Sequence, residues 1–209
     1  MMIFFDLDGT LIDSNGVWVT VDLDFLARRG LELTPEYSYT VGHSIFPVAA
    51  QFTKDYYHLD ESPEAIMKEW RDMAYDAYAG TIPLKPGARE LLDKLKGEGR
   101  SMALLTAGLP ELAKAALARH RLEPYFEGLF FAQDARMEKR DTRVYPLAAR
   151  RFNTRPSDCV LIEDAPDNCA AARSAGFRVV GVYDDFYSKQ WDQVTANSHR
   201  AVRSLEELL

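Results

Sequence analysis

The first residues of the chain place two carboxylates at the end of an apolar stretch. Residues 1–5 form a short apolar run that ends abruptly at Asp6, which predicts a central strand of a parallel sheet. Side chains two positions apart in a strand share a face, so Asp6 and Asp8 begin together where Gly9 lets the backbone leave the sheet. Two such carboxylates repel each other unless a cation joins them or one is protonated. On these residues alone, an ordinary turn at Asp8-Gly9 is the alternative interpretation.

Length and composition fit a large globular domain, or a domain that carries an insertion. The chain has 209 residues, with 47% apolar and 27% charged side chains. Its formal net charge of -7 argues against nucleic acid or an anionic membrane as the partner, and suits an acidic site for a divalent cation. The apolar run at 1–5 is too short for a signal peptide or a membrane span, so we expect a cytoplasmic protein. Cys159 and Cys169 lack metal or redox spacing and are expected to be buried free thiols.

Hydrophobic periodicity divides the chain into two parts. Between Val17 and Gly80 the pattern is helical, and the third expected helix has Ser62 as N-cap and Pro63 at its first position. From Pro86 onward helices and strands alternate, the pattern of a parallel α/β sheet. We therefore predict an α/β fold, a Rossmann-like parallel sheet with helices on both faces and an inserted all-helical cap. The predicted core domain comprises residues 1–13 and 82–209, and the predicted cap domain residues 14–81.

The expected elements can be given by their ranges. In the cap, helices are expected at 17–30, 47–57 and 63–78. In the core, strands are expected at 1–5, 101–105, 129–131, 159–162 and 177–182, and helices at 87–96, 110–119, 144–152, 167–175 and 204–209. Ligands of open parallel sheets bind outside the carboxyl ends of the strands, so the residues that follow each strand are candidates for a common site.

Polar groups with complementary chemistry follow these strands. They are Asp6, Asp8, Thr106, Ala107, Glu163 and Asp164, with Lys139 on a loop between the last two strand ends. Together they supply a nucleophile, a cation site, a hydroxyl with backbone N–H donors and a fixed positive charge, as phosphoryl transfer requires. Asp6 is already ionised at neutral pH and can form an aspartyl-phosphate. Mg²⁺ prefers oxygen ligands, which Asp6, Asp164 and the backbone carbonyl of Asp8 could provide, and the Asp8 side chain could then transfer protons.

Over essentially its whole length the chain resembles the haloacid dehalogenase (HAD) superfamily. The segment Asp6-Leu7-Asp8-Gly9-Thr10 matches the first motif of that family, which implies Asp6 as nucleophile and Asp8 as general acid/base. Leu104-Leu105-Thr106 resembles the second motif, which implies that Thr106 and the Ala107 N–H bind the phosphoryl group. Residues 163–168 resemble the fourth motif, which implies Asp164 as a metal ligand and Glu163 beside it, in the ligand set or just outside it. A helical cap inserted after the first motif is similar to the phosphoglycolate phosphatase and β-phosphoglucomutase subclass.

Two positions depart from the family pattern. Lys139 is the predicted third-motif cation, because Tyr145 follows six residues later, where the family often has an aromatic residue. Many relatives have Pro-x-Pro after this lysine, whereas here the next residue is Arg140, so either Lys139 or Arg140 could neutralise the phosphate. Asn168 stands where relatives often carry Asp or Gly, and its amide either hydrogen-bonds near the metal or satisfies backbone groups.

Three functions are compatible with the resemblance, and the motifs favour one of them. Dehalogenases and phosphonate-cleaving relatives lack the second aspartate, so Asp8 favours a Mg²⁺-dependent phosphatase of a small phosphorylated metabolite. A phosphomutase of the β-phosphoglucomutase type is the alternative, although residues 43–47 after Gly42 lack the arginine that such mutases carry in the cap. A non-catalytic binding protein on the same fold is the second alternative. The expected partner is a small metabolite, not nucleic acid or membrane, and a monomer is expected; the sequence does not identify the substrate.

Overall fold

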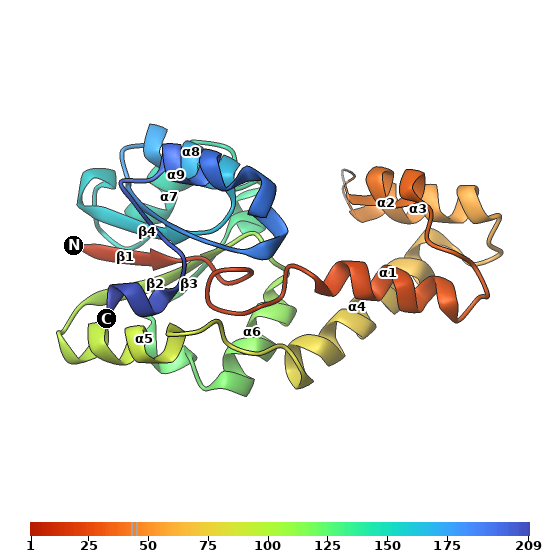
Figure 1. Cartoon of the computed structure of the whole chain (residues 1–209), viewed down its shortest axis with the longest axis horizontal. Coiled ribbons are helices and arrows are strands. Elements are labelled where there is room, and N and C mark those ends of the chain that lie inside the picture. The colour runs from red at the N-terminus through yellow and green to blue at the C-terminus, as the bar shows by residue number, and fades with distance from the viewer. Residues whose placement is uncertain (43, 45) are drawn as a thin grey trace. The chain divides into compact units, whose positions relative to one another are not determined.

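The chain forms two compact units in the computed structural model, which describes residues 1–42, 44 and 46–209 (Figure 1). The sheet unit comprises Met1–Asn15 and Ile82–Leu209, and the helical unit comprises Gly16–Thr81. The chain therefore leaves the sheet unit after Asn15 and returns to it at Ile82.

A parallel sheet forms the centre of the sheet unit. Within the described residues it has six strands in the order β3-β2-β1-β4-β5-β6. They are β1 (Met2–Phe5), β2 (Ser101–Thr106), β3 (Leu129–Phe131), β4 (Cys159–Glu163), β5 (Arg178–Val182) and β6 (Arg200–Val202). The order runs outward from β1 to β3 on one side and from β4 to β6 on the other, so the strand order reverses between β1 and β4. The predicted α/β fold with a Rossmann-like parallel sheet is confirmed.

Burial on both faces explains why β1 is apolar throughout. All of its side chains are buried, and neighbouring residues point to opposite faces. Phe4 packs against Phe152 and Phe177, whereas Phe5 packs against Phe126. Each buried phenylalanine contributes about 1.5–3 kcal/mol relative to an exposed one. This central strand therefore holds the residue that follows it, Asp6, at a well-determined position.

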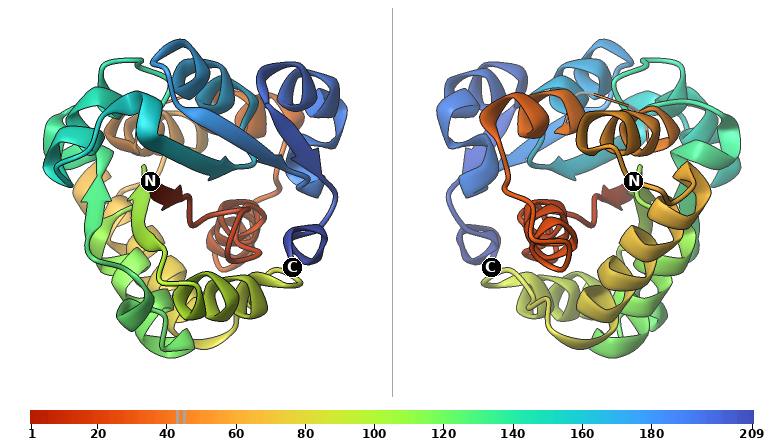
Figure 2. Two further views of the ribbon diagram at one scale, coloured as in Figure 1. Left: turned by 90° about the vertical axis from the view of Figure 1, so that its left-hand side faces the viewer. Right: turned by 90° about the vertical axis from the view of Figure 1, so that its right-hand side faces the viewer.

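Helices cover both faces of the sheet, as Figures 1 and 2 show. One face carries α7 (Val144–Arg151), α8 (Pro166–Ser174) and α9 (Trp191–Asn197), and the other carries α5 (Ala88–Gly97) and α6 (Pro110–His120). Short 3₁₀ helices occupy Glu123–Tyr125, Ala132–Ala135, Pro156–Asp158, Asp185–Gln190 and Leu205–Leu208. Cys159 and Cys169 are buried free thiols, as predicted.

The helical unit packs around aromatic side chains. Its helices are α1 (Val17–Ala27), α2 (Pro35–Gly42), α3 (Phe46–Tyr57) and α4 (Pro63–Gly80). Trp70 contacts Phe25 and Phe46 edge-on, with ring centroids 5.6 and 5.5 Å apart. Helix α4 begins as its sequence predicts, since the Ser62 hydroxyl accepts a hydrogen bond from the Ala65 N–H (3.3 Å). None of the helices formed by the described residues combines the length and apolar composition that a bilayer crossing requires.

Several short elements differ from the sequence prediction. Helix α2, helix α9 and strand β6 were not predicted, because each buries too few side chains to show a period: α9 fully buries only Val194, and β6 only Val202. Strand β4 extends one residue further than predicted, so Glu163 is its last residue and not the first residue after it.

Candidate active site

A tight turn follows β1 and positions the first two acids. The Asp6 N–H donates to the Ile162 carbonyl (3.0 Å), which continues the pairing with β4, and the N–H groups of Leu11 and Ile12 then both donate to the Leu7 carbonyl. Gly9 has φ +77°, in the left-handed region that favours glycine. A Cβ there would lie 2.1 Å from Asn15 Nδ2 and 2.2 Å from Asp164 Oδ2. The turn therefore brings the Gly9 backbone directly against side chains of the site.

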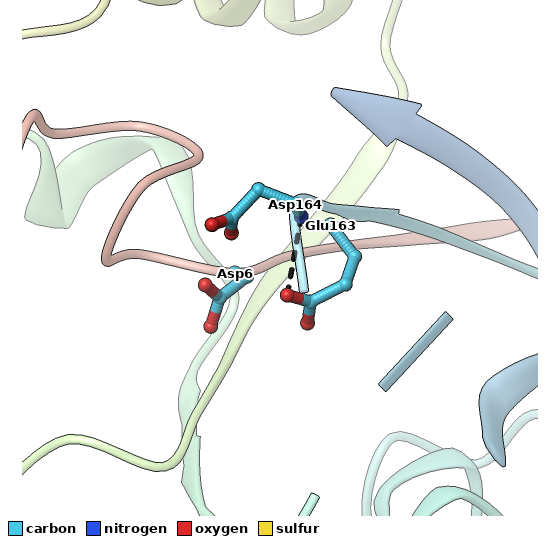
Figure 3. Close-up of side chains that lie close together, drawn as sticks. All are labelled: Asp6, Glu163 and Asp164. Carbon is cyan, nitrogen blue, oxygen red and sulfur yellow. Dashed lines mark hydrogen bonds between the residues drawn. The ribbon is translucent and has the colours of Figure 1, made fainter. Parts of the chain in front are cut away.

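Three buried acids meet where β1 and β4 end side by side. One carboxylate oxygen from each of Asp6, Glu163 and Asp164 lies within 4.8 Å of the other two. Figure 3 shows these three side chains close together. Glu163 Oε1 accepts hydrogen bonds from the N–H groups of Asp164 (3.1 Å) and Ala165 (3.0 Å). Burial, followed by the charge of Glu163, raises the pKa of Asp6 well above its usual range, and the same two causes raise the pKa of Asp164. The cluster is therefore costly to ionise without a compensating cation.

Lys139 supplies one positive charge to this cluster. Its Nζ donates to Asp6 Oδ1 (2.5 Å) and to Glu163, and its side chain is only 1% exposed. Burial by itself lowers the pKa of Lys139, but the charges of Asp6 and Glu163 outweigh it, so that the pKa lies above its usual value. The Tyr145 hydroxyl donates to the Lys139 carbonyl (2.8 Å) and holds the loop. Arg140, the sequence alternative, has a side chain that is 68% exposed and pairs with Glu138. The fold thus places Lys139, and not Arg140, against Asp6.

Asp8 lies near a different part of the site. Its Oδ1 accepts a hydrogen bond from the Ser14 hydroxyl (2.6 Å). Thr106, the last residue of β2, is buried and accepts from the Gly108 N–H (2.9 Å). A Cβ on Gly108 would lie 3.0 Å from Asp8 Oδ2 and 3.2 Å from Thr106 Oγ1, so the carboxylate and the hydroxyl flank the same stretch of backbone. Ala107, which lies between Thr106 and Gly108 in the chain, is exposed.

Sequence reasoning missed the residues that hold Asp164. Thr10 Oγ1 donates to Asp164 Oδ1 (2.8 Å), and Asn15 Nδ2 donates to Asp164 Oδ2 (2.9 Å). Asn15 Nδ2 also contacts Asp184 Oδ1 (3.1 Å), and Asp184 Oδ2 pairs with Lys85 Nζ (2.6 Å). Asp184 follows β5 much as Asp164 follows β4, so the strand-end rule could have found it. No comparable signal identifies Asn15 or Lys85.

Two further residues border the site. The Asn168 carbonyl accepts a hydrogen bond from the Tyr145 hydroxyl (3.0 Å), and a role for its side-chain amide stays a prediction. Tyr187, which sequence reasoning also missed, is half-buried. Its pKa is raised by burial and then by the charges of Asp164, Glu163 and Asp6. Its position in the 3₁₀ helix after β5 gives no sequence signal of this interaction.

The donor set fits a hard divalent cation. Three carboxylates face one ammonium group, so the ionised cluster carries an excess of two negative charges. Both oxygens of Asp164 accept one hydrogen bond each, and a carboxylate oxygen has two acceptor sites. Oxygen ligands of this kind suit Mg²⁺ better than a soft transition metal.

Comparisons with known proteins agree with this geometry. The family model "haloacid dehalogenase-like hydrolase" matches residues 1–176. Hexitol phosphatase B of Escherichia coli K12 is 27% identical over 180 residues, which cover 85% of this chain and 81% of that protein. Fructose-1-phosphate phosphatase YqaB of the same strain is 27% identical over 182 residues, which cover 86% of this chain and 95% of that protein. The crystal structure of β-phosphoglucomutase from Clostridium difficile superposes with a TM-score of 0.75 at 18% identity, covering 100% of this chain and 92% of that chain.

The chain belongs to the haloacid dehalogenase-like hydrolase family. The predicted family is therefore confirmed, and so is the predicted enzyme class, a phosphoric monoester hydrolase of this family, since the two relatives just named are phosphatases.

Proposed function

We propose that this hydrolase is a Mg²⁺-dependent phosphatase of small phosphorylated sugars that acts through an aspartyl-phosphate at Asp6. The observation that carries the proposal is the position of Asp6. It follows the central strand, binds Lys139, and shares a buried cluster with Asp164. The sugar-phosphate substrates are suggested by the names of the hexitol and fructose-1-phosphate phosphatases.

The proposed cation site uses oxygen ligands from the residues that follow β1 and β4. Asp6, Asp164 and the backbone carbonyl of Asp8 would hold Mg²⁺, while Glu163, already bound to Lys139 and to two N–H groups, would lie beside them. When bound, the ion would neutralise charge on the phosphoryl oxygens.

In the first proposed step, Asp6 displaces the sugar alcohol. A carboxylate oxygen of Asp6 attacks phosphorus, and the bond from phosphorus to the sugar oxygen breaks. Asp8, in its protonated form, gives its proton to that departing oxygen. The Thr106 hydroxyl, the Ala107 N–H and Lys139 would bind the phosphoryl oxygens and stabilise the charge that spreads over them.

In the second proposed step, water restores the enzyme. Asp8, now a carboxylate, accepts a proton from a water molecule as that water attacks phosphorus. The bond between phosphorus and the Asp6 oxygen breaks, which releases inorganic phosphate and the free Asp6 carboxylate. The helical unit, inserted directly after the first motif, is proposed to select the sugar and limit the access of other water.

A phosphomutase would share the first step and return the phosphoryl group to a second hydroxyl of the sugar. The sequence argument against it, the absence of an arginine after Gly42, concerns a segment in which His43 and Ile45 lie outside the described residues. The alternatives separate experimentally: a mutase needs a bisphosphorylated sugar for turnover, and a non-catalytic binding protein shows no turnover at all.

The test is phosphate release from p-nitrophenyl phosphate, hexitol phosphates and fructose 1-phosphate, with Mg²⁺ and with chelator. Wild type is compared with Asp6→Asn and with Asp13→Asn, an exposed acid of the same turn. We expect Mg²⁺-dependent hydrolysis that Asp6→Asn abolishes and Asp13→Asn retains. Activity that survives Asp6→Asn would refute the mechanism. If wild type releases phosphate from none of the monoesters, the mutase or the binding protein would be favoured.

A further inference from the structure

The side-chain amide of Asn15 bridges two buried carboxylates. Its Nδ2 lies 2.9 Å from Asp164 Oδ2 and 3.1 Å from Asp184 Oδ1. An amide nitrogen carries two hydrogens and no acceptor, so one hydrogen is available for each carboxylate. Asn15 thereby sets the separation between Asp164 and a second acid that belongs to none of the family motifs discussed above.

Asp184 is itself held firmly. It is 4% exposed, and its Oδ2 pairs with Lys85 Nζ at 2.6 Å, where the lysine side chain is only 15% exposed. Its Oδ1 also accepts from the Phe186 N–H (3.0 Å). A buried carboxylate paired in this way is a strong acceptor with a defined position. Lys85 therefore fixes Asp184, and Asp184 fixes the Asn15 amide.

Beyond Asn15, both carboxylate oxygens of Asp164 are held by hydrogen bonds. Thr10 Oγ1 donates to Oδ1 and Asn15 Nδ2 donates to Oδ2, and each oxygen keeps one acceptor site for a cation. Such outer contacts to a metal ligand commonly contribute 10- to 100-fold in metal affinity.

Residues next to both connections between the two units take part in this network. Asn15 is the last residue of the first segment of the sheet unit, and Lys85 comes shortly after the second segment begins at Ile82. The two segments are also joined through their backbones, since the Asp13 N–H donates to the Pro83 carbonyl (3.0 Å) and the Lys85 N–H to the Leu11 carbonyl (2.9 Å).

We propose that Asn15, Asp184 and Lys85 are positioning residues that orient Asp164 for a divalent cation. The inference rests on the proposed function, because it assigns these residues to the Mg²⁺ site of that mechanism. A positioning role and a purely electrostatic role predict opposite effects of Lys85 removal on cation affinity. Removing the positive charge of Lys85 strengthens the attraction for a cation by Coulomb's law, whereas loss of positioning weakens binding.

The test is calorimetric titration of Mg²⁺ into metal-free protein, without substrate. We compare wild type with Asn15→Ala, which changes no charge, and with Lys85→Met. The matched control is Lys68→Met, which breaks an ion pair of the same length (2.6 Å to Asp72) whose lysine is 72% exposed. We expect Mg²⁺ affinity to fall about 10- to 100-fold in Asn15→Ala, to fall in Lys85→Met, and to stay within about twofold in Lys68→Met.

A double variant separates one network from two independent effects. If Asn15 and Lys85 act in series, Asn15→Ala/Lys85→Met loses no more affinity than Asn15→Ala alone; independent effects would multiply. Thermal melting without Mg²⁺ verifies folding, and Asn15→Ser replaces Asn15→Ala if the latter does not fold. Unchanged Mg²⁺ affinity in Asn15→Ala, or tighter Mg²⁺ binding in Lys85→Met, overturns the inference. The proposed function still stands in that case if wild type binds Mg²⁺ and releases phosphate. Wild type that neither binds Mg²⁺ nor releases phosphate overturns both.

Discussion

Lys139 and Asp6, which are 133 positions apart in the sequence, form a buried ion pair of 2.5 Å at the carboxyl end of the central strand. Lys139 reaches this position from a loop between β3 and β4, and the same ammonium group binds Glu163. Lys139 therefore joins the proposed nucleophile Asp6, which follows β1, to Glu163 at the end of β4, next to the proposed metal ligand Asp164.

Replacing Lys139 tests how much that pair contributes to folding. Lys139→Met leaves two buried carboxylates without their cation, so we expect the free energy of unfolding to fall by about 3–5 kcal/mol in metal-free protein. Arg140→Met, at the exposed neighbour, should change it by less than about 0.5 kcal/mol. Urea unfolding of both variants measures the difference. Equal destabilisation by the two variants would contradict the burial argument.

Gly9 offers a test of the close approach between the turn and the site. Gly9→Ala adds a Cβ at φ +77°, 2.1 Å from Asn15 Nδ2 and 2.2 Å from Asp164 Oδ2. We expect it to abolish phosphatase activity and to destabilise the fold by more than the roughly 1–2 kcal/mol of left-handed strain. Gly30→Ala is the matched control, because Gly30 has φ +65° with no atom near the added Cβ. If the two variants lose equal stability, backbone strain alone accounts for the glycine.

Asp8→Asn separates the two proposed proton transfers. With a sugar phosphate, whose alcohol needs a proton to depart, we expect turnover to fall by about 10²–10⁴-fold. With p-nitrophenyl phosphate the departing phenolate needs little acid catalysis, so the first step should survive and the second should become limiting. Rapid-quench kinetics should then show a burst of nitrophenolate followed by slow turnover. Equal loss on both substrates, without a burst, would remove Asp8 from the acid role.

Asp22 of the helical unit predicts a pH-dependent change in stability. Burial raises its pKa from 3.8 to about 6, against a lowering effect of a hydrogen bond with Tyr37. The folded state therefore favours the protonated acid, so the contribution of Asp22 to stability is greatest below pH 4 and is lost as the pH rises through 6. Asp22→Asn should stabilise the protein at pH 8, by about 1–2 kcal/mol once solvent screening is allowed for, and have little effect near pH 4.

Thermal melting from pH 4 to pH 8 measures this effect. Asp24→Asn, at an exposed position of the same helix, serves as control and should show no such trend. If Asp22→Asn raises the stability by the same amount at every pH, ionisation of Asp22 is not the cause.

The sequence by itself was sufficient to predict a parallel sheet and the candidate residues at its carboxyl edge. Asp6, Thr106 and Asp164 could be proposed together because each follows an apolar run, and parallel strands end at one edge whatever the details of packing. The same reasoning missed α2, α9 and β6, which are too short or bury too few side chains to produce a readable period.

Only the tertiary structure decided which polar residues complete the site. Lys139 and Arg140 are adjacent bases in a loop, and local sequence does not reveal which one the fold buries against Asp6. The bridge from Lys85 through Asp184 and Asn15 to Asp164 joins segments that are distant in the chain, through side chains that would be unremarkable on a surface. Hydrophobic periodicity reports which residues are buried by their own element, whereas hydrogen bonds and ion pairs depend on distances between elements, which exist only once the chain has folded.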